Sequence, residues 1–253
     1  MATPFDGKIY LVEVKGQFLA RKSLGDVSRL ITETMPNADG VFLQVCQGKE
    51  WQGKFDNDAK EINGPNDIAQ WVSALGSRGL ETHVWGIPQG LDPVAESQTF
   101  IQAAKVNGVR SLGLDVEHGQ AYFRGSADSG RQFMQLLRDA LGWDFHIALI
   151  LDPRRNRPFN LYVDPFLPFV QSLHPMVYPK EFNQPVPTVL DAAFSVLSPY
   201  GKPIVPMLQS YNQTPPADIT QQGNYAFQKG AAGISYFCLG DRHMGQAECA
   251  AES

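Results

Sequence analysis

Eight short apolar runs recur along the chain at about the spacing of one strand-plus-helix unit, each bounded by glycine, proline or asparagine. Most runs are almost continuously apolar, which is typical of parallel strands covered on both faces. A single (β/α)8 barrel spanning residues 1–253 is therefore predicted, and 253 residues is a usual size for that fold. The expected strands lie near residues 9–14, 41–46, 82–87, 111–117, 145–151, 173–178, 204–209 and 233–239.

Helix starts are marked by side-chain acceptors in front of proline. Asp92, Asp164 and Thr214 are each followed by a proline, which favours an N-cap with proline at the first helical position. Ser126 precedes an amphipathic stretch and is a further predicted N-cap. The last helix, near residues 245–251, is barely marked, and no linker divides the chain.

Two prolines lie inside expected strands. Pro175 falls in the sixth strand and Pro206 in the seventh, and each removes one ladder hydrogen bond. We expect bulges or frayed pairing at both positions.

The charge balance excludes some partners. With 21 basic and 26 acidic residues the formal net charge is -5, and no basic run exceeds a pair, so binding to nucleic acid or to an anionic membrane is not favoured. No apolar run approaches the ~18 residues of a membrane span, and the N-terminus lacks the plan of a signal peptide. We expect a soluble protein without a secretion address, unless a leader or partner domain is missing, and the oligomeric state stays open.

Cysteines and histidines do not predict a metal site. The three cysteines show no paired spacing, and Cys46 and Cys238 lie in apolar strands as expected core residues. The five histidines include neither His-x-His on the first strand nor His-Glu-x-x-His, and no glycine nest for phosphate follows the last two strands. No cofactor or metal is expected.

The fourth expected strand ends in two carboxylates, Asp115 and Glu117. Residues two apart on a strand share a face, so their Cα atoms should lie roughly 6.6 Å apart at the active-site end of the barrel. Repulsion and partial burial would raise one pKa and keep one group protonated as a general acid, and the titration would belong to the pair. Alternatively, the two acids cap a helix or pair with Arg110 or Arg124.

The other strand ends supply acidic, amide and aromatic side chains. Carboxylates exchange protons, amides bind hydroxyls and flat rings stack on the apolar faces of sugars, so a polysaccharide substrate is predicted. Trp51, on the loop after the second strand, either stacks on a sugar or anchors its own loop, whereas Trp85 is expected to face the cleft. The remaining predicted binding residues are Glu13, Gln44, Asp152, Gln209, Tyr211 and Phe237.

Three segments of the chain resemble the motif set of the chitinase and endo-N-acetylglucosaminidase family. They are Asp115-Val-Glu117, Met176-Val-Tyr178 and residues 233–237. The resemblance implies that Glu117 is the acid/base, that Asp115 orients the substrate's acetamido group and that Tyr178 bonds to that group.

Two further resemblances point to the bacterial cell wall. Barrel muramidases of bacteria and phage also carry Asp-x-Glu at the fourth strand. Residues 175–179 and 204–209 are similar to segments of bacterial glycoside-hydrolase barrels, some of which accompany peptidoglycan-binding LysM modules. The three resemblances together imply a glycoside hydrolase acting on an N-acetylhexosamine polymer such as peptidoglycan.

Departures from the chitinase motifs favour a rival interpretation. The family's upstream aspartates fall on Gly113 and Arg110, the aspartate after its tyrosine is Pro179, and its strand-eight tryptophan is Phe237. The rival is a catalytically inactive barrel that binds glycans or serves as a structural domain.

The mechanism depends on whether a second carboxylate takes part. Without one, the substrate's own acetamido oxygen attacks the anomeric carbon while Glu117 protonates the leaving oxygen. Asp152 and Glu13 are the reserve candidates for ordinary retaining or inverting chemistry. Arg154 or Arg155 could meet a substrate carboxylate, such as the lactyl group of muramic acid, or form a salt bridge.

Overall fold

The protein is described by a computed structural model that covers residues 2–13, 23–55, 61–117, 119–154, 158–211 and 213–239. Its eight barrel strands are β1 (Ile9–Glu13), β2 (Gly40–Gln47), β4 (Glu81–Ile87), β5 (Val109–Asp115), β6 (His146–Leu151), β7 (Ser172–Val177), β8 (Met207–Gln209) and β9 (Ile234–Leu239).

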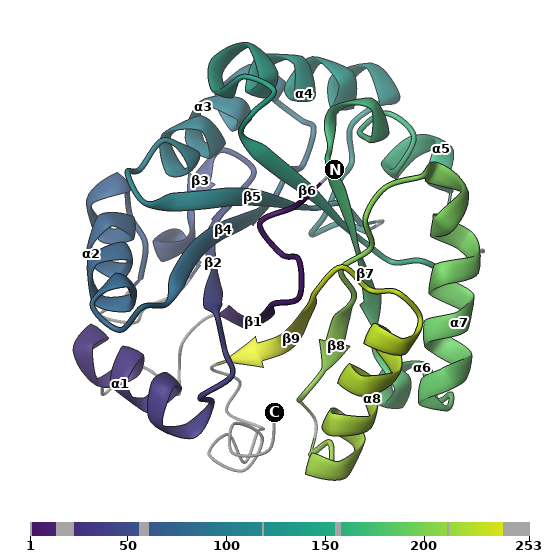
Figure 1. The fold of residues 1–253 in the computed structure, drawn as a ribbon. Helices are drawn as coiled ribbons and strands as arrows, with labels where there is room; N and C mark the ends of the chain where they lie inside the picture. Colours follow the sequence, from purple (N-terminus) through teal and green to yellow (C-terminus); the bar gives the residue numbers. More distant parts are fainter. Residues whose placement is uncertain are drawn as a thin grey trace.

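Neighbouring barrel strands pair in parallel, in the order β1-β9-β8-β7-β6-β5-β4-β2, and β1 also pairs with β2. The sheet therefore closes on itself, and helices surround it (Figure 1). A two-residue strand, β3 (Glu50–Trp51), pairs antiparallel with the end of β2 outside the ring. The predicted (β/α)8 barrel is confirmed.

Eight α-helices lie in the described part of the chain. They are α1 (Leu24–Thr34), α2 (Pro65–Gly76), α3 (Pro93–Ala104), α4 (Ala127–Leu141), α5 (Phe159–Tyr162), α6 (Pro179–Phe182), α7 (Val186–Leu197) and α8 (Pro216–Gln228). Single 3-10 turns occur at Gln52–Lys54, Leu167–Phe169 and Ser198–Tyr200. None of these helices combines the length and apolar character that a membrane crossing needs. The expected helix near residues 245–251 lies outside the described residues.

The two strand prolines have different effects. Pro206 shortens β8 to three residues, and Ile204 pairs with Leu173 only through an isolated bridge. Pro175 lies within a continuous β7 and pairs with Leu151 of β6. On its other side the β7–β8 ladder is interrupted between Leu173 and Met176, so the expected frayed pairing at Pro175 is found on the β8 side.

Two of the predicted N-caps are confirmed and two are wrong. The side chains of Asp92 and Ser126 accept hydrogen bonds from the backbone N–H three residues on. Asp164 instead follows α5, where its N–H donates to the carbonyl of Phe159. Thr214 uses its hydroxyl to donate to the carbonyl of Tyr211, and α8 begins two residues later.

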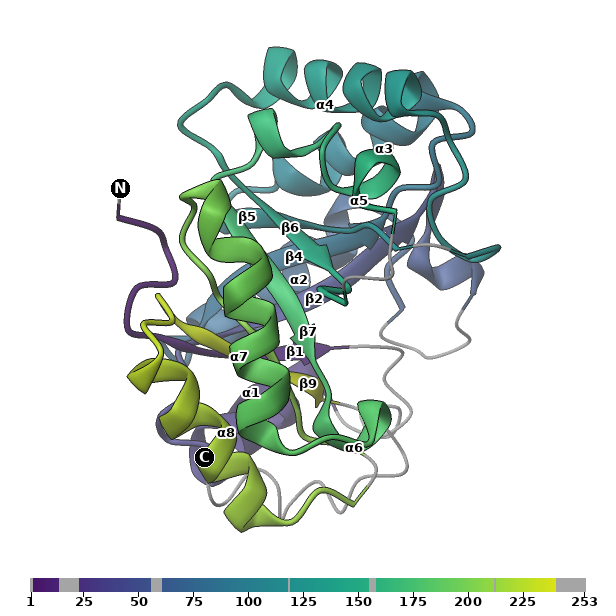
Figure 2. The same cartoon turned by 90° about the vertical axis from the view of Figure 1, so that its right-hand side faces the viewer.

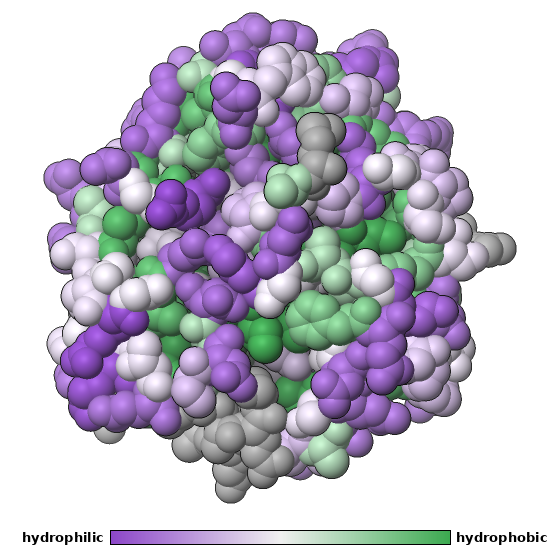
Figure 3. Space-filling model, viewed as in Figure 1, coloured by the Kyte–Doolittle hydropathy of each residue, from purple (hydrophilic) through white to green (hydrophobic). Residues whose placement is uncertain are grey.

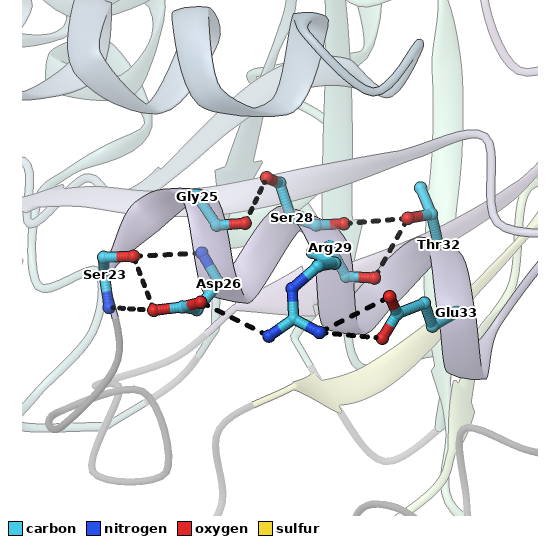
Figure 4. Close-up of polar contacts among 7 residues, drawn as sticks. All are labelled: Ser23, Gly25, Asp26, Ser28, Arg29, Thr32 and Glu33. Carbon is cyan, nitrogen blue, oxygen red and sulfur yellow. Dashed lines mark hydrogen bonds and ion pairs between the residues drawn. The ribbon is translucent and has the colours of Figure 1, made fainter.

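Helix α1 shows how local chemistry sets a boundary (Figure 4). The Ser23 hydroxyl accepts a hydrogen bond from the N–H of Asp26 at 3.1 Å, and the Asp26 carboxylate accepts from the N–H of Ser23 at 3.4 Å. This reciprocal capping box satisfies two backbone donors at the helix start. Arg29 bridges Asp26 and Glu33 along the exposed face.

A plug of aromatic rings closes the barrel at the amino ends of its strands. The Phe5 ring centroid lies 5.1, 5.2 and 4.8 Å from the rings of His83, His146 and His174. Each histidine has one ring nitrogen bonded to a buried serine hydroxyl, at 2.7, 2.8 and 3.0 Å respectively.

The chain's N-terminal segment crosses this end in Figure 1, and apolar patches are scattered among polar side chains on the same face (Figure 3). The strands run toward the opposite side, where α6 lies (Figure 2). The plug and the N-terminal segment thus occupy the amino end, which leaves the carboxyl end for a ligand.

Candidate active site

A cavity of about 460 Å³ opens at the carboxyl ends of the strands. That size falls within the range of small-molecule and cofactor sites. Its described charged lining residues are Asp115, Glu117, Asp152, Arg154 and Glu181. Its rings are Trp85, Tyr122, Tyr178, Phe182, Tyr211 and Phe237.

Asp115 and Glu117 both line this cavity, although they are held differently. Asp115 ends β5 and is only 7% exposed, whereas Glu117 lies in the loop beyond the strand and is half-buried. The expected strand to residue 117 is therefore too long. Arg110 is the exposed second residue of the same strand, at the opposite end of β5 from Asp115.

Asp115 is the member of the pair that keeps a proton. Burial, and then the negative charge of Glu117, raise the pKa of Asp115 well above its ordinary value. Its buried Oδ1 has no hydrogen-bond partner among the described residues. The arrangement therefore places a neutral carboxylic acid, with an oxygen ready to accept a hydrogen bond, beside a more accessible carboxylate.

Tyr178 follows β7 and stands in an aromatic wall. Its ring lies 5.5 Å from Tyr211 and 5.7 Å from Phe237, and Tyr211 lies 5.7 Å from Phe237. Burial is the main cause that raises the pKa of Tyr178 well above its ordinary value, so the hydroxyl stays protonated. In the structure it donates to the Met207 sulfur at 3.1 Å. Thioether sulfur is a weak acceptor, so a carbonyl oxygen would compete well for this donor.

Asp152 and Arg154 form a salt bridge. This was one of the two expected roles of Arg154, the other being contact with a substrate carboxylate. The Arg154 Nη2 lies 2.6 Å from Asp152 Oδ2, and Nε lies 2.9 Å from Oδ1. The guanidinium carbon also lies 4.4 Å from the centre of the Phe182 ring. Because both carboxylate oxygens of Asp152 already accept from Arg154, this group suits binding better than proton transfer. Arg155 lies outside the described residues.

Two predicted binding residues support the cavity from behind and do not line it. The Glu13 carboxylate accepts a hydrogen bond from the backbone N–H of Gln44 at 3.3 Å. The backbone carbonyl of Glu13 accepts another from Trp85 Nε1 at 3.1 Å. Gln209 is fully buried, and its side-chain oxygen accepts from the N–H of Lys180 at 3.0 Å. The Glu13 side chain thus accepts from the backbone of β2 and the Gln209 side chain from the backbone of α6, and neither residue lines the cavity.

Trp51 also lies away from the cavity. It is half-buried in β3 and packs against the apolar layer between the barrel and its helices. The loop-anchor alternative therefore describes its surroundings. Gln44, Trp85, Tyr211 and Phe237 do line the cavity, as expected.

No protein-family profile and no curated protein matches the chain, but solved structures match over almost its full length. A family 18 N-acetylglucosaminidase from Paenibacillus barengoltzii is 10% identical with a TM-score of 0.63, covering 98% of this chain and 99% of that one. The spore cortex-lytic enzyme SleL from Bacillus megaterium is 11% identical with a TM-score of 0.60, covering 98% and 74%.

The chain shares the (β/α)8 barrel fold of these two glycoside hydrolases. A third similar structure is the xylanase and α-amylase inhibitor protein XAIP-II from Scadoxus multiflorus, at 11% identity and a TM-score of 0.60, covering 94% of each chain. The same fold is thus shared by enzymes and by an inhibitor, and likeness at these identities shows the fold alone.

Sequence reasoning missed several lining residues. Glu181 and Phe182 lie on α6, directly after the Tyr178-Pro179 pair, and Glu181 accepts a hydrogen bond from the Tyr211 hydroxyl at 3.1 Å. Tyr122 lies on the loop after Glu117. In each case the available signal was a position just beyond a predicted strand end. Among the described residues, no cluster of histidine, cysteine or acidic side chains could hold a metal ion.

Proposed function

We propose that this protein is a glycoside hydrolase that cleaves a polysaccharide containing N-acetylhexosamine, with Glu117 as the acid/base, Asp115 as its orienting partner and Tyr178 as a ligand of the acetamido group. The observation that carries the proposal is the buried Asp115, whose pKa burial raises, beside the more open Glu117 in a ring-lined cavity. In many enzymes two carboxyl groups in unequal surroundings have different pKa values, so one acts as an acid and the other as a base.

The acid pair accounts for proton transfer. One proton shared between Asp115 and Glu117 is retained near neutral pH because burial opposes a second negative charge. Glu117 is the more exposed partner and so is the group that reaches a glycosidic oxygen. In the reaction the shared proton passes to Glu117, which gives it to the leaving oxygen as the glycosidic bond breaks.

The cavity also offers matching groups for an acetamido substituent. The unpartnered Asp115 Oδ1 can accept from the amide N–H, and the Tyr178 hydroxyl can leave the Met207 sulfur to donate to the amide oxygen. Ile150, Met176 and Met207 supply apolar surface for the methyl group. Held there, the amide oxygen forms the new bond to the anomeric carbon. Water then opens this ring intermediate, with Glu117 as the base.

A second catalytic carboxylate is not needed for this scheme. The two reserve candidates are already engaged: Asp152 by the Arg154 guanidinium, and Glu13 by the backbone of Gln44. Substrate-assisted hydrolysis is therefore the route that these residues support best.

Bacterial peptidoglycan is the substrate we propose within this class. Its support is the resemblance to muramidases and to LysM-associated barrels, together with the fold shared with a spore cortex-lytic enzyme and an N-acetylglucosaminidase.

The test is mass spectrometry of products from purified peptidoglycan, chitin and plain glucans. Wild-type protein should release fragments with new reducing ends only from the N-acetylated polymers. Glu117→Gln should lower that rate by about 10²- to 10⁴-fold, the usual contribution of a general acid. The matched control is Glu33→Gln on the exposed face of α1, which should retain the wild-type rate. Near-wild-type release by Glu117→Gln would show that the assignment is wrong.

A non-hydrolytic glycan-binding barrel is the second candidate. It is favoured by the fold shared with an inhibitor protein and by the missing motif residues. A Cβ at Gly113 would lie 3.0 Å from Ile150 Cδ1 and 3.1 Å from Trp85 Cβ, so the aspartate that the chitinase family carries there would need these two side chains to shift. Binding to the same polysaccharides without any product, unchanged by Glu117→Gln, would support this candidate.

A further inference from the structure

The cavity is lined by two buried side-chain oxygens that have no partner. Gln44 is only 4% exposed, and its Oε1 has no hydrogen-bond partner among the described residues. The same holds for Oδ1 of Asp115. Buried polar atoms of folded proteins are nearly always hydrogen-bonded, because an unpaired one costs free energy. Two such acceptors in one cavity indicate a ligand that brings its own donors.

Strand pairing explains how the two acceptors reach the same cavity. Gln44 of β2 is paired with Trp85 of β4. Trp85 is in turn paired with Gly113 of β5, and Asp115 lies two residues further along that strand. Residues two apart on a strand share a face. The side chains of Gln44, Trp85 and Asp115 therefore enter the barrel from three neighbouring strands, with the indole ring on the middle one.

Glu13 holds the surroundings of Gln44 in place. Its carboxylate accepts a hydrogen bond from the backbone N–H of Gln44, and its backbone carbonyl accepts one from the Trp85 indole. The backbone that carries Gln44 and the ring beside it are thus fixed before a ligand arrives. A preorganised acceptor loses less conformational freedom on binding, so more of its hydrogen-bond energy appears as affinity.

An N-acetylhexosamine unit carries two kinds of donor on one ring. In the proposed function its acetamido N–H donates to Asp115 Oδ1. In a 1,4-linked polymer the oxygens at C1 and C4 belong to the linkages, so the free hydroxyls of the ring are those at C3 and C6. N-acetylmuramic acid has only the C6 hydroxyl, because its lactyl ether replaces the one at C3. Gln44 can therefore distinguish the two sugars of peptidoglycan if its partner is the C3 hydroxyl.

We propose that Gln44 is a substrate-binding residue whose Oε1 accepts a hydrogen bond from a free ring hydroxyl, at C3 or C6, of the sugar whose acetamido group meets Asp115. This inference rests on the proposed function and deepens it. A site with a buried acceptor rejects an analogue that lacks the matching hydroxyl, since the acceptor is then left unpaired. A C3 partner excludes N-acetylmuramic acid from this position, so that peptidoglycan is cut at the anomeric carbon of N-acetylglucosamine.

The test is calorimetric binding of an N-acetylglucosamine trimer to the Glu117→Gln protein, with and without Gln44→Met. Methionine has a similar volume but only a weak acceptor, so the change should weaken binding of the intact trimer by about 10- to 100-fold. It should not weaken binding of the trimer that lacks the partner hydroxyl, and the 3-deoxy and 6-deoxy trimers thus identify that hydroxyl. The matched control is Gln135→Met on the exposed face of α4, where Nε2 donates to Asp139 at 2.7 Å, and it should leave every affinity unchanged.

Thermal unfolding separates this role from a structural one. Gln44→Met removes a buried polar atom that has no partner in the protein, so the unliganded variant should unfold at the wild-type temperature or above it. An unchanged affinity for the intact trimer, an equal loss for all three trimers, or no binding of any trimer overturns the proposal. Cleavage by the Glu117→Gln protein overturns the proposed function instead, while the three affinities still decide the Gln44 contact.

Discussion

The two ends of the barrel interior use the same eight strands for different purposes. At the amino end, Phe5 packs among three histidines that are fully or nearly buried. At the carboxyl end, Asp115 and Glu117 face an open cavity. Titratable groups occur at both ends, but only those at the carboxyl end can meet a ligand.

The comparison shows that burial changes the pKa values of titratable groups at both ends of the barrel. Desolvation lowers the pKa values of His83, His146 and His174 and keeps these rings neutral inside the plug. Desolvation of Asp115 also produces a neutral group, but one beside a half-exposed acid that can exchange its proton. The same physical effect therefore keeps the titratable groups neutral at both ends, but only Asp115 has an accessible partner with which to exchange a proton.

Removing the plug should have the largest effect on stability. Phe5→Ala should lower the free energy of unfolding by about 3–5 kcal/mol, since it leaves a cavity beneath the barrel. Urea denaturation measures this loss. Phe55→Ala, at a residue that is 41% exposed, is the control and should change the free energy little. If the folded Phe5→Ala protein also lost its activity per molecule, the two ends would not be independent.

Acid should weaken the amino end next. Burial, and then the charges of His83 and Arg138, lower the pKa of His146 from 6.5 to about 4. The unfolded chain then binds the proton first, so stability is complete above pH 6.5 and is lost as the pH falls toward 4. This group alone accounts for about 3 kcal/mol. Chemical denaturation between pH 7 and pH 4 measures the slope, and a slope unchanged in His146→Gln would contradict the account.

A smaller effect is expected from Tyr178→Phe at the carboxyl end. Losing one donor to the acetamido oxygen should lower kcat/KM by about tenfold on N-acetylated polymers. The stability should hardly change, because the hydroxyl gives up only a weak bond to the Met207 sulfur. Rates on N-acetylated oligosaccharides, with thermal unfolding alongside, check both parts. A large stability loss without a rate effect would assign Tyr178 to the core.

The smallest effects should come from α1, which touches neither end. Ser23→Ala removes the capping box and should lower the free energy of unfolding by about 1 kcal/mol. Arg29→Ala breaks only exposed ion pairs and should leave the free energy of unfolding almost unchanged. Both variants should keep the wild-type activity and the wild-type pH dependence of stability. They therefore serve as controls for the larger losses of stability and activity expected from variants at the two ends of the barrel.

Local patterns in the chain were enough to predict the barrel, the approximate positions of its strands and several helix starts. Continuous apolar runs fold as covered strands wherever they occur, and the Ser126 and Asp92 side chains cap the backbone next to them. The position of Asp115 at the end of the fourth barrel strand follows from the same series of apolar runs. These features depend on residues close together in the chain, and for that reason the sequence alone predicts them.

The remaining features depend on contacts between distant segments. The protonation of Asp115 is set by burial among several strands, and Gln209 turns to the backbone of Lys180 because α6 passes beside it. Tyr122 lines the same cavity as Glu117 because the loop after β5 is anchored by rings from another part of the chain. Side-chain direction beyond a strand end and the local dielectric are properties of the assembled barrel, so no local pattern could reveal them.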